Sequence, residues 1–285
     1  MDLSVQAFWV PKLGNAVDEY EDAFAWSPGK QHFAIADGAT ESSYADRWAQ
    51  LLVRKFIKDP PALSPKPVTL EPWLAPLQSE WHSAIQWDRL PWYAEEKARQ
   101  GAFAALLGIR FAGPPKKKVW WKRLFERGPD LPPGTVRWQA IAVGDSCLFQ
   151  IRNGEMVTAF PIQTADQFNS RPLLLSSNPA RNRQVWSELK YAEGDCHPGD
   201  LFVLVTDAIA CWFLKQVEAG HFPWQTLRGL NSDDQFASFV AQLRQQNQMR
   251  NDDTTLILFS LVPVGTRVPR GQISDVTVFS KKEKV

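Results

Sequence analysis

The sequence is poor in the residues from which cross-linked and zinc-binding proteins are built. It has three cysteines and four histidines, with no Cys-x-x-Cys pair and no His-x-x-x-His spacing. So sparse and odd a number of cysteines predicts no disulfide framework. A zinc hydrolase is also disfavoured, because the chain lacks closely spaced zinc ligands.

The chain also lacks an excess of charge of either sign. It has 32 Lys and Arg against 31 Asp and Glu among 285 residues, a net charge of +1 at pH 7. This balance provides no overall field to attract nucleic acid or an anionic membrane, so we expect no nucleic-acid partner.

Long apolar runs are missing too. None approaches the roughly 18 residues that cross a bilayer, so we expect no transmembrane segment. The N-terminus has no basic stretch followed by a long apolar one, and we expect no signal peptide. Together with the sparse cysteines, this predicts a cytoplasmic protein.

What the chain has is an ordinary globular composition, with 44% hydrophobic and 22% charged residues. Short apolar runs between turn residues predict many strands. The predicted strands are Ala23–Trp26, His32–Ala36, Leu106–Phe111, Val136–Val143, Ser146–Arg152, Glu155–Phe160, Leu201–Thr206, Thr254–Leu261 and Val276–Phe279. The Asn153-Gly154 step predicts a tight hairpin, because both residues tolerate a positive φ.

Helices are predicted in two groups. The early group covers 42–58, 70–90 and 93–107, and the late group covers Ala208–Gly220 and Asp234–Gln246. Strands that cluster apart from helices predict α+β layers rather than repeated βαβ crossovers.

Two segments have the composition of inserted loops, the Pro-rich stretch 58–72 and the stretch 114–133. The second contains six basic residues, two Trp and one Phe between proline pairs. It is either a strand-connecting loop with basic, solvated ends or a docking site for an acidic partner, a membrane surface or nucleic acid.

Acidic residues recur where apolar strands begin or end. The sites are Glu21-Asp22, Asp37, Asp207 and Asp252-Asp253. Any one of these acids alone is explained as a helix cap or a turn former. If the strands are neighbours, however, the carboxylates converge and need cations to offset their repulsion. Carboxylate oxygens are hard ligands that suit Mg²⁺ or Mn²⁺.

These acids fall into a succession of five short motifs. They are Glu21-Asp22, Asp37-Gly38, Val143-Gly144-Asp145-Ser146, Val205-Thr206-Asp207 and Asp252-Asp253-Thr254-Thr255-Leu256. In order and spacing, over about residues 10–262, the succession resembles the metal-dependent serine/threonine protein phosphatases of type 2C, in a divergent bacterial-type form. The resemblance implies a four-layer αββα sandwich, with two antiparallel sheets flanked by helix pairs, as one domain over residues 1–285. It also implies a signalling hydrolase that removes phosphate from phosphoserine or phosphothreonine of a phosphoprotein substrate, by attack of a metal-bridging hydroxide.

The resemblance further implies a binuclear centre of Mg²⁺ or Mn²⁺. Asp37 resembles the carboxylate that bridges both ions, and Gly38 resembles the ligand that acts through its backbone carbonyl. Asp207 and Asp252 resemble the ligands of the first ion. Glu21 resembles the ligand of the second, direct or through water.

The remaining roles concern the water and a third ion. Asp22 resembles the residue that orders metal-bound water, so Asp37, Asp22 and Glu21 form the implied catalytic group. Asp145 resembles a ligand of a weaker third ion. Two departures lie near these positions: Ala208 replaces the usual glycine after Asp207, and Cys211 stands where many members carry a further Asp.

A third departure affects the phosphate itself. Val17 stands where the family usually has the arginine that grips the phosphate, which leaves the phosphate-binding residue unknown. The candidates to replace it are Lys12, Arg47, Arg181 and Arg183. These departures keep two alternatives open. One is a catalytically weak or inactive member that binds a phosphoprotein or a regulatory partner. The other is a phosphohydrolase that acts on small phosphate esters.

Overall fold

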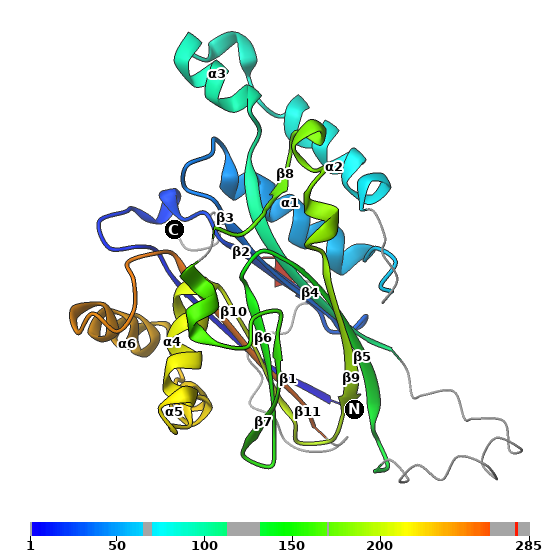
Figure 1. Ribbon diagram of the computed structural model, residues 1–285, viewed down its shortest axis with the longest axis vertical. Coiled ribbons are helices and arrows are strands. Elements are labelled where there is room, and N and C mark those ends of the chain that lie inside the picture. The colour runs from blue at the N-terminus through cyan, green and yellow to red at the C-terminus, as the bar shows by residue number, and fades with distance from the viewer. Residues whose placement is uncertain (1, 65–69, 113–131, 170, 263–276, 279–285) are drawn as a thin grey trace, which may run out of the picture.

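The computed structural model describes residues 2–64, 70–112, 132–169, 171–262 and 277–278 (Figure 1). Within these ranges the strands form two antiparallel sheets. The first sheet has the order β1-β11-β10-β6-β7. Its strands are β1 (Asp2–Val10), β11 (Thr254–Val262), β10 (Leu201–Val205), β6 (Cys147–Arg152) and β7 (Glu155–Phe160). Asn153 and Gly154 both have positive φ in the turn between β6 and β7, so the predicted hairpin is confirmed.

The second sheet has the order β12-β2-β3-β4-β5-β9, and a short strand β8 also pairs with β4. Its strands are β12 (Thr277–Val278), β2 (Ala23–Ser27), β3 (His32–Gly38), β4 (Phe103–Ala112), β5 (Val136–Val143), β9 (Lys190–Cys196) and β8 (Leu175–Ser176).

Helices cover the outer face of each sheet (Figure 1). They are α1 (Ala45–Lys58), α2 (Glu71–Ser83), α3 (Trp92–Arg99), α4 (Asp207–Glu218), α5 (Pro223–Arg228) and α6 (Asp233–Gln245). Helix α1 packs on β2, β3 and β4 of the second sheet, whereas α4 and α6 pack on β11 and β1 of the first. The layers therefore run helix, sheet, sheet, helix, as the α+β prediction requires. None of the helices within the described ranges is long and apolar enough to span a bilayer.

Alternation along the strands fixes which side chains lie between the sheets. In β3, Phe33 and Ile35 belong to the core between the sheets, whereas the intervening alanines face α1. The ring of Phe33 stacks on Phe259 of β11, with ring centroids 3.9 Å apart, and so joins the two sheets. The next residue with the orientation of Ile35 is Asp37. Its carboxylate therefore emerges at one end of the space between the sheets.

The structure corrects the predicted helix over 93–107. Helix α3 ends at Arg99 and β4 begins at Phe103. Gly101 between them has a φ of 92°, which a continuing helix cannot accommodate. The apolar residues that follow are buried and pair with β3 and β5, so tertiary pairing decides the conformation of this segment.

Strands β1, β8 and β9 and helix α5 were not predicted. The sequence of β9, KYAEGDC, is polar and contains glycine, because β9 lies at the edge of its sheet among the described strands and is only partly buried. Residues 59–64 and 70, from the first predicted insert, form neither helix nor strand, while Lys58 ends α1 and Glu71 begins α2. The second predicted insert, 114–133, lies outside the described residues except for its last two.

Candidate metal centre

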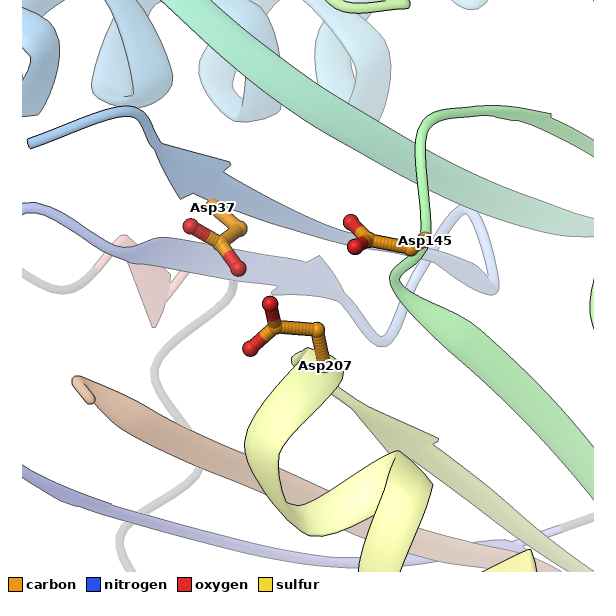
Figure 2. Close-up of side chains that lie close together, drawn as sticks. All are labelled: Asp37, Asp145 and Asp207. Atoms are coloured by element: carbon orange, nitrogen blue, oxygen red, sulfur yellow. The ribbon is translucent and has the colours of Figure 1, made fainter. Parts of the chain in front are cut away.

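Three carboxylates from separate elements meet at one end of the space between the sheets (Figure 2). Asp37 comes from the end of β3, Asp145 from the turn between β5 and β6, and Asp207 from the first residue of α4. One carboxylate oxygen of each lies within 4.8 Å of the other two. In Figure 2 the carboxylates of Asp37 and Asp207 face each other, and that of Asp145 points toward them. We call these three residues the acidic cluster.

The local fold explains two of these positions. Asp207 is separated from β10 only by Thr206 and opens α4, where the helix dipole favours a negative charge. Asp145 follows Gly144, whose φ of 92° lets the chain turn sharply between two strands. A Cβ at Gly144 would lie 2.5 Å from the Cβ of Ala105, so the turn also requires a residue without a side chain.

Burial and mutual repulsion disfavour the charged forms of the carboxyl groups in the acidic cluster. Burial raises the pKa of Asp37 well above its ordinary value, and the nearby carboxylates of Asp22 and Asp145 raise it further. Burial also raises the pKa of Asp145. Asp207 is buried, and its Oδ1 has no hydrogen-bond partner among the residues that the structure describes. Closely spaced carboxylates with an unsatisfied buried oxygen fit a bound cation, and an all-oxygen set fits Mg²⁺ or Mn²⁺.

Asp22 lies beside the acidic cluster rather than in it. Its side chain is buried, and Oδ2 accepts a 2.7 Å hydrogen bond from the hydroxyl of Thr255. The hydroxyl of Tyr20 contacts the same Thr255 oxygen. Burial, followed by the charge of Asp253, raises the pKa of Asp22 well above its ordinary value. Asp22 is thus a buried acid that is fixed by its neighbours and close enough to raise the pKa of Asp37.

The backbones of Glu21 and Gly38 lie close together. A Cβ at Gly38 would lie 2.6 Å from the carbonyl oxygen of Glu21, so only glycine fits. The side chain of Glu21 is not one of the three converging carboxylates. Burial raises its pKa, while a hydrogen bond with Thr40 acts in the opposite direction.

Asp252 and Asp253 have different partners, as expected for adjacent residues at the start of a strand. Asp253 accepts hydrogen bonds from the backbone N–H groups of Lys12 and Glu21, at 2.9 and 2.7 Å. It therefore fixes the N-terminal loop next to the site. Asp252 accepts a 3.0 Å hydrogen bond from the N–H of Asp253 and is not one of the three converging carboxylates. Its charge nevertheless contributes to the raised pKa values of Asp37 and Asp145.

Sequence reasoning missed Arg250 at this site. Its guanidinium forms an ion pair with Asp207, and its Nε lies 3.7 Å from Asp252 Oδ2. The signal in the sequence was a cation two residues before Asp252, in the turn that leads into β11. Arg250 is therefore a counter-ion to two of the predicted metal ligands.

The three departures noted in the sequence have definite places. Val17 is exposed in a short 3₁₀ turn, Val17–Glu19, and brings no charge there. Ala208 is buried in the first turn of α4. Cys211 lies one turn later against the core between α4 and the first sheet, and burial raises the pKa of its thiol. A thiol with a raised pKa does not replace the carboxylate that a hard third ion would prefer.

A cavity of about 360 Å³ adjoins the acidic cluster. It is lined by Asp145, by residues of the segment between β7 and β9, among them Gln167 and Leu173, and by Lys190 at the start of β9. A second cavity of about 650 Å³ lies between α2 and α3 and includes none of the predicted site residues. Of these two cavities, the smaller borders the candidate centre.

No family model and no curated protein matches the sequence. Solved structures do match the fold. The *Mycobacterium tuberculosis* serine/threonine phosphatase PstP/Ppp is 16% identical, with a TM-score of 0.54 over 92% of this chain and 100% of that one. The *Staphylococcus aureus* serine/threonine phosphatase Stp1 is 13% identical, with a TM-score of 0.56 over 92% and 96%. A PstP catalytic domain in complex with two manganese ions is 18% identical, with a TM-score of 0.51 over 92% and 99%.

At these identities the likeness shows the fold. The chain has the αββα fold of the type 2C serine/threonine phosphatases, so the fold that the sequence motifs predicted is confirmed.

Proposed function

We propose that the protein is a metal-dependent phosphatase that removes phosphate from phosphoserine or phosphothreonine of proteins. The observation that carries the proposal is the approach of Asp37, Asp145 and Asp207 within 4.8 Å. The phosphatase fold of the whole chain supports it. A structural neighbour with two manganese ions supports the choice of Mg²⁺ or Mn²⁺ as cofactor.

The proposed centre holds two divalent ions. Asp37 would bridge them, and the backbone carbonyl of Gly38 would be a ligand. Asp207 and Asp252 would bind the first ion, and Glu21 would bind the second, directly or through water. Asp252 and Glu21 lie outside the acidic cluster. The charge of Asp252 acts on Asp37 and Asp145, and the carbonyl oxygen of Glu21 lies beside Gly38, which suits residues that would complete a metal site.

The other residues would shape the reaction. When bound, divalent ions lower the pKa of a water molecule and polarise the phosphoryl group. Asp22 is a buried acid fixed by Thr255, so it can orient the attacking water and hold a proton. Asp145 would hold a weaker third ion. The cavity beside Asp145 provides room for the residues that flank the phosphate in a phosphoprotein.

A second candidate function is a catalytically weak or inactive member of the family that binds a phosphoprotein or a regulatory partner. Two observations favour it. Val17 brings no cation to the place where the family usually grips phosphate, and Arg250 neutralises Asp207. In that case the site would retain its shape and bind its partner without turnover.

The two functions are separated by measuring turnover of a phosphothreonine peptide and of an aryl phosphate. The assays use Mn²⁺, Mg²⁺ or a chelator, with the Asp37→Asn variant in parallel. The proposed function predicts turnover of the peptide that the chelator and the variant both abolish. Turnover of the aryl phosphate alone indicates an enzyme for small esters. Absence of turnover in folded wild-type protein contradicts the phosphatase and supports the binding role.

A further inference from the structure

Phosphate binding in the proposed reaction needs a cation that the expected position does not provide. Val17 stands there, with 48% of its surface exposed and no charge. A hydrogen bond from a charged donor is stronger than one between neutral groups. A site without a charged donor would bind phosphate weakly. The proposed reaction therefore needs another cation near the acidic cluster.

Most cations near the site already have other contacts. Arg244 donates to the carbonyl oxygen of Pro11 and to the hydroxyl of Thr254, and so holds the loop together. Lys190, on the wall of the neighbouring cavity, lies 3.4 Å from Glu188. Lys12 donates to the hydroxyl of Thr40, on the side of Glu21.

One further candidate from the sequence, Arg47, also has another contact. The guanidinium of Arg47 donates to the carbonyl of Ala84 at the end of α2. This contact directs it away from the acidic cluster and toward the helices that cover the second sheet.

Arg250 is placed differently. Its side chain is 48% exposed, whereas the side chain of Asp207 that it contacts is only 10% exposed. The guanidinium therefore reaches from the surface over the opening of the acidic cluster. It also contacts Asp252, and its charge lowers the pKa values of Asp37 and Asp145. Among the cations considered, it is the one that contacts both Asp207 and Asp252 and whose charge also acts on the carboxylates at the centre.

Its partners are the residues that divalent ions would engage. Asp207 and Asp252 are the proposed ligands of the first ion, and carboxylates that bind an ion no longer need a guanidinium. Arg250 comes from the turn after α6, and its half-exposed side chain has room to move outward. A planar guanidinium released there presents paired N–H donors that match the spacing of phosphate oxygens.

We propose that Arg250 is the phosphate-positioning residue: it leaves Asp207 and Asp252 when divalent ions bind them, and it then grips the phosphate of the substrate. This inference rests on the proposed function. It assigns to a residue near the C-terminal end of the fold the task that the family usually gives to an N-terminal arginine.

The test compares Arg250→Gln, Arg250→Lys and a matched control, Arg228→Gln. Arg228 is an exposed arginine in α5, which follows the end of α4 opposite to Asp207. Calorimetry measures inorganic phosphate binding to each Mg²⁺-loaded full-length protein, and Mn²⁺ binding in the absence of phosphate. Peptide turnover gives KM and kcat. Circular dichroism checks that each variant is folded.

We expect Arg250→Gln to weaken phosphate binding and to raise KM about 10- to 100-fold, with a smaller effect on kcat. Arg250→Lys should recover part of the loss, because it restores the charge without the paired donors. Mn²⁺ should bind Arg250→Gln as tightly as wild type or more tightly, since the competing internal cation is gone. Arg228→Gln should behave as wild type.

Two results would overturn the inference. One is unchanged phosphate affinity in Arg250→Gln. The other is weaker Mn²⁺ binding in that variant, which would mean that Arg250 only organises the carboxylates. If wild type shows no turnover while phosphate binding still depends on Arg250, the proposed function fails and the assignment of Arg250 as the phosphate grip stands. If wild type is active and Arg250→Gln matches it, the inference alone fails.

Discussion

The hydroxyl of Thr255 donates to Asp22 Oδ2 over 2.7 Å, and this bond ties one sheet to the other next to the acidic cluster. Thr255 belongs to β11 of the first sheet, and Asp22 precedes β2 of the second. The bond partly satisfies a carboxyl group that is only 2% exposed. The bond therefore both stabilises the contact between the sheets and holds the carboxyl group of Asp22 in place.

Thr255→Val tests this connection with little change of shape. Loss of the hydroxyl leaves a buried acid without that donor, so we expect the free energy of unfolding to fall by about 1–3 kcal/mol. Thr255→Ser retains the hydroxyl and should lose much less. Chemical denaturation of the three proteins measures the difference, and equal losses in Val and Ser variants would argue against the bond.

At Gly38 the surrounding backbone leaves no room for a side chain. Its missing Cβ would lie 2.6 Å from the carbonyl oxygen of Glu21, and backbone atoms there cannot move aside easily. We expect Gly38→Ala to lower the free energy of unfolding by about 1–3 kcal/mol. Gly29→Ala is the matched control, since a Cβ there meets nothing within 4 Å and its φ is not in the left-handed range. Thermal denaturation that affects both variants alike would show that crowding at Gly38 is not the cause.

The pH dependence of stability follows from the raised pKa values of Asp22 and Asp37. In ion-free protein these carboxyls keep their protons at pH values where the unfolded chain, with ordinary pKa values near about 4, has released them. The folded state then binds more protons than the unfolded state, so stability falls as pH rises through this window.

We therefore expect the Tm of chelated protein to decrease from about pH 5 to about pH 8. Asp37→Asn removes one of the two groups, and its decrease should be shallower. Thermal melts across this range measure both slopes. A wild-type slope no steeper than that of the variant would contradict the raised pKa of Asp37.

Much of the fold could be predicted because its signals are local. The strands around Phe33 and Phe202 are short apolar runs that end in turn residues, and the Asn153-Gly154 hairpin is specified by two residues. Strand β9 was missed because a partly exposed strand tolerates polar residues and glycine. The helix predicted across Phe103 was wrong because pairing with β3 and β5 outweighs the local helical pattern.

The candidate site, like the fold, could be predicted only in part from the sequence. Asp37 and Asp207 could be named in advance because each lies at the end of an apolar strand, and Asp145 because it belongs to a motif that resembles the phosphatase family. The ion pair of Arg250 with Asp207 could not, because the two residues are far apart in the sequence and only the packing of α4 against β11 brings their segments together.

In the proposed function the acidic cluster binds divalent ions, and calorimetric titration of Mn²⁺ into chelator-treated protein measures that binding without a substrate. Wild type, Asp207→Asn and the control Asp234→Asn are compared; Asp234 is an exposed acid in the first turn of α6. We expect wild type and the control to bind two ions, and Asp207→Asn to bind them with an affinity reduced by a factor of about 10 or more. No saturable Mn²⁺ binding by folded wild-type protein, or equal affinity in Asp207→Asn, would contradict this expectation.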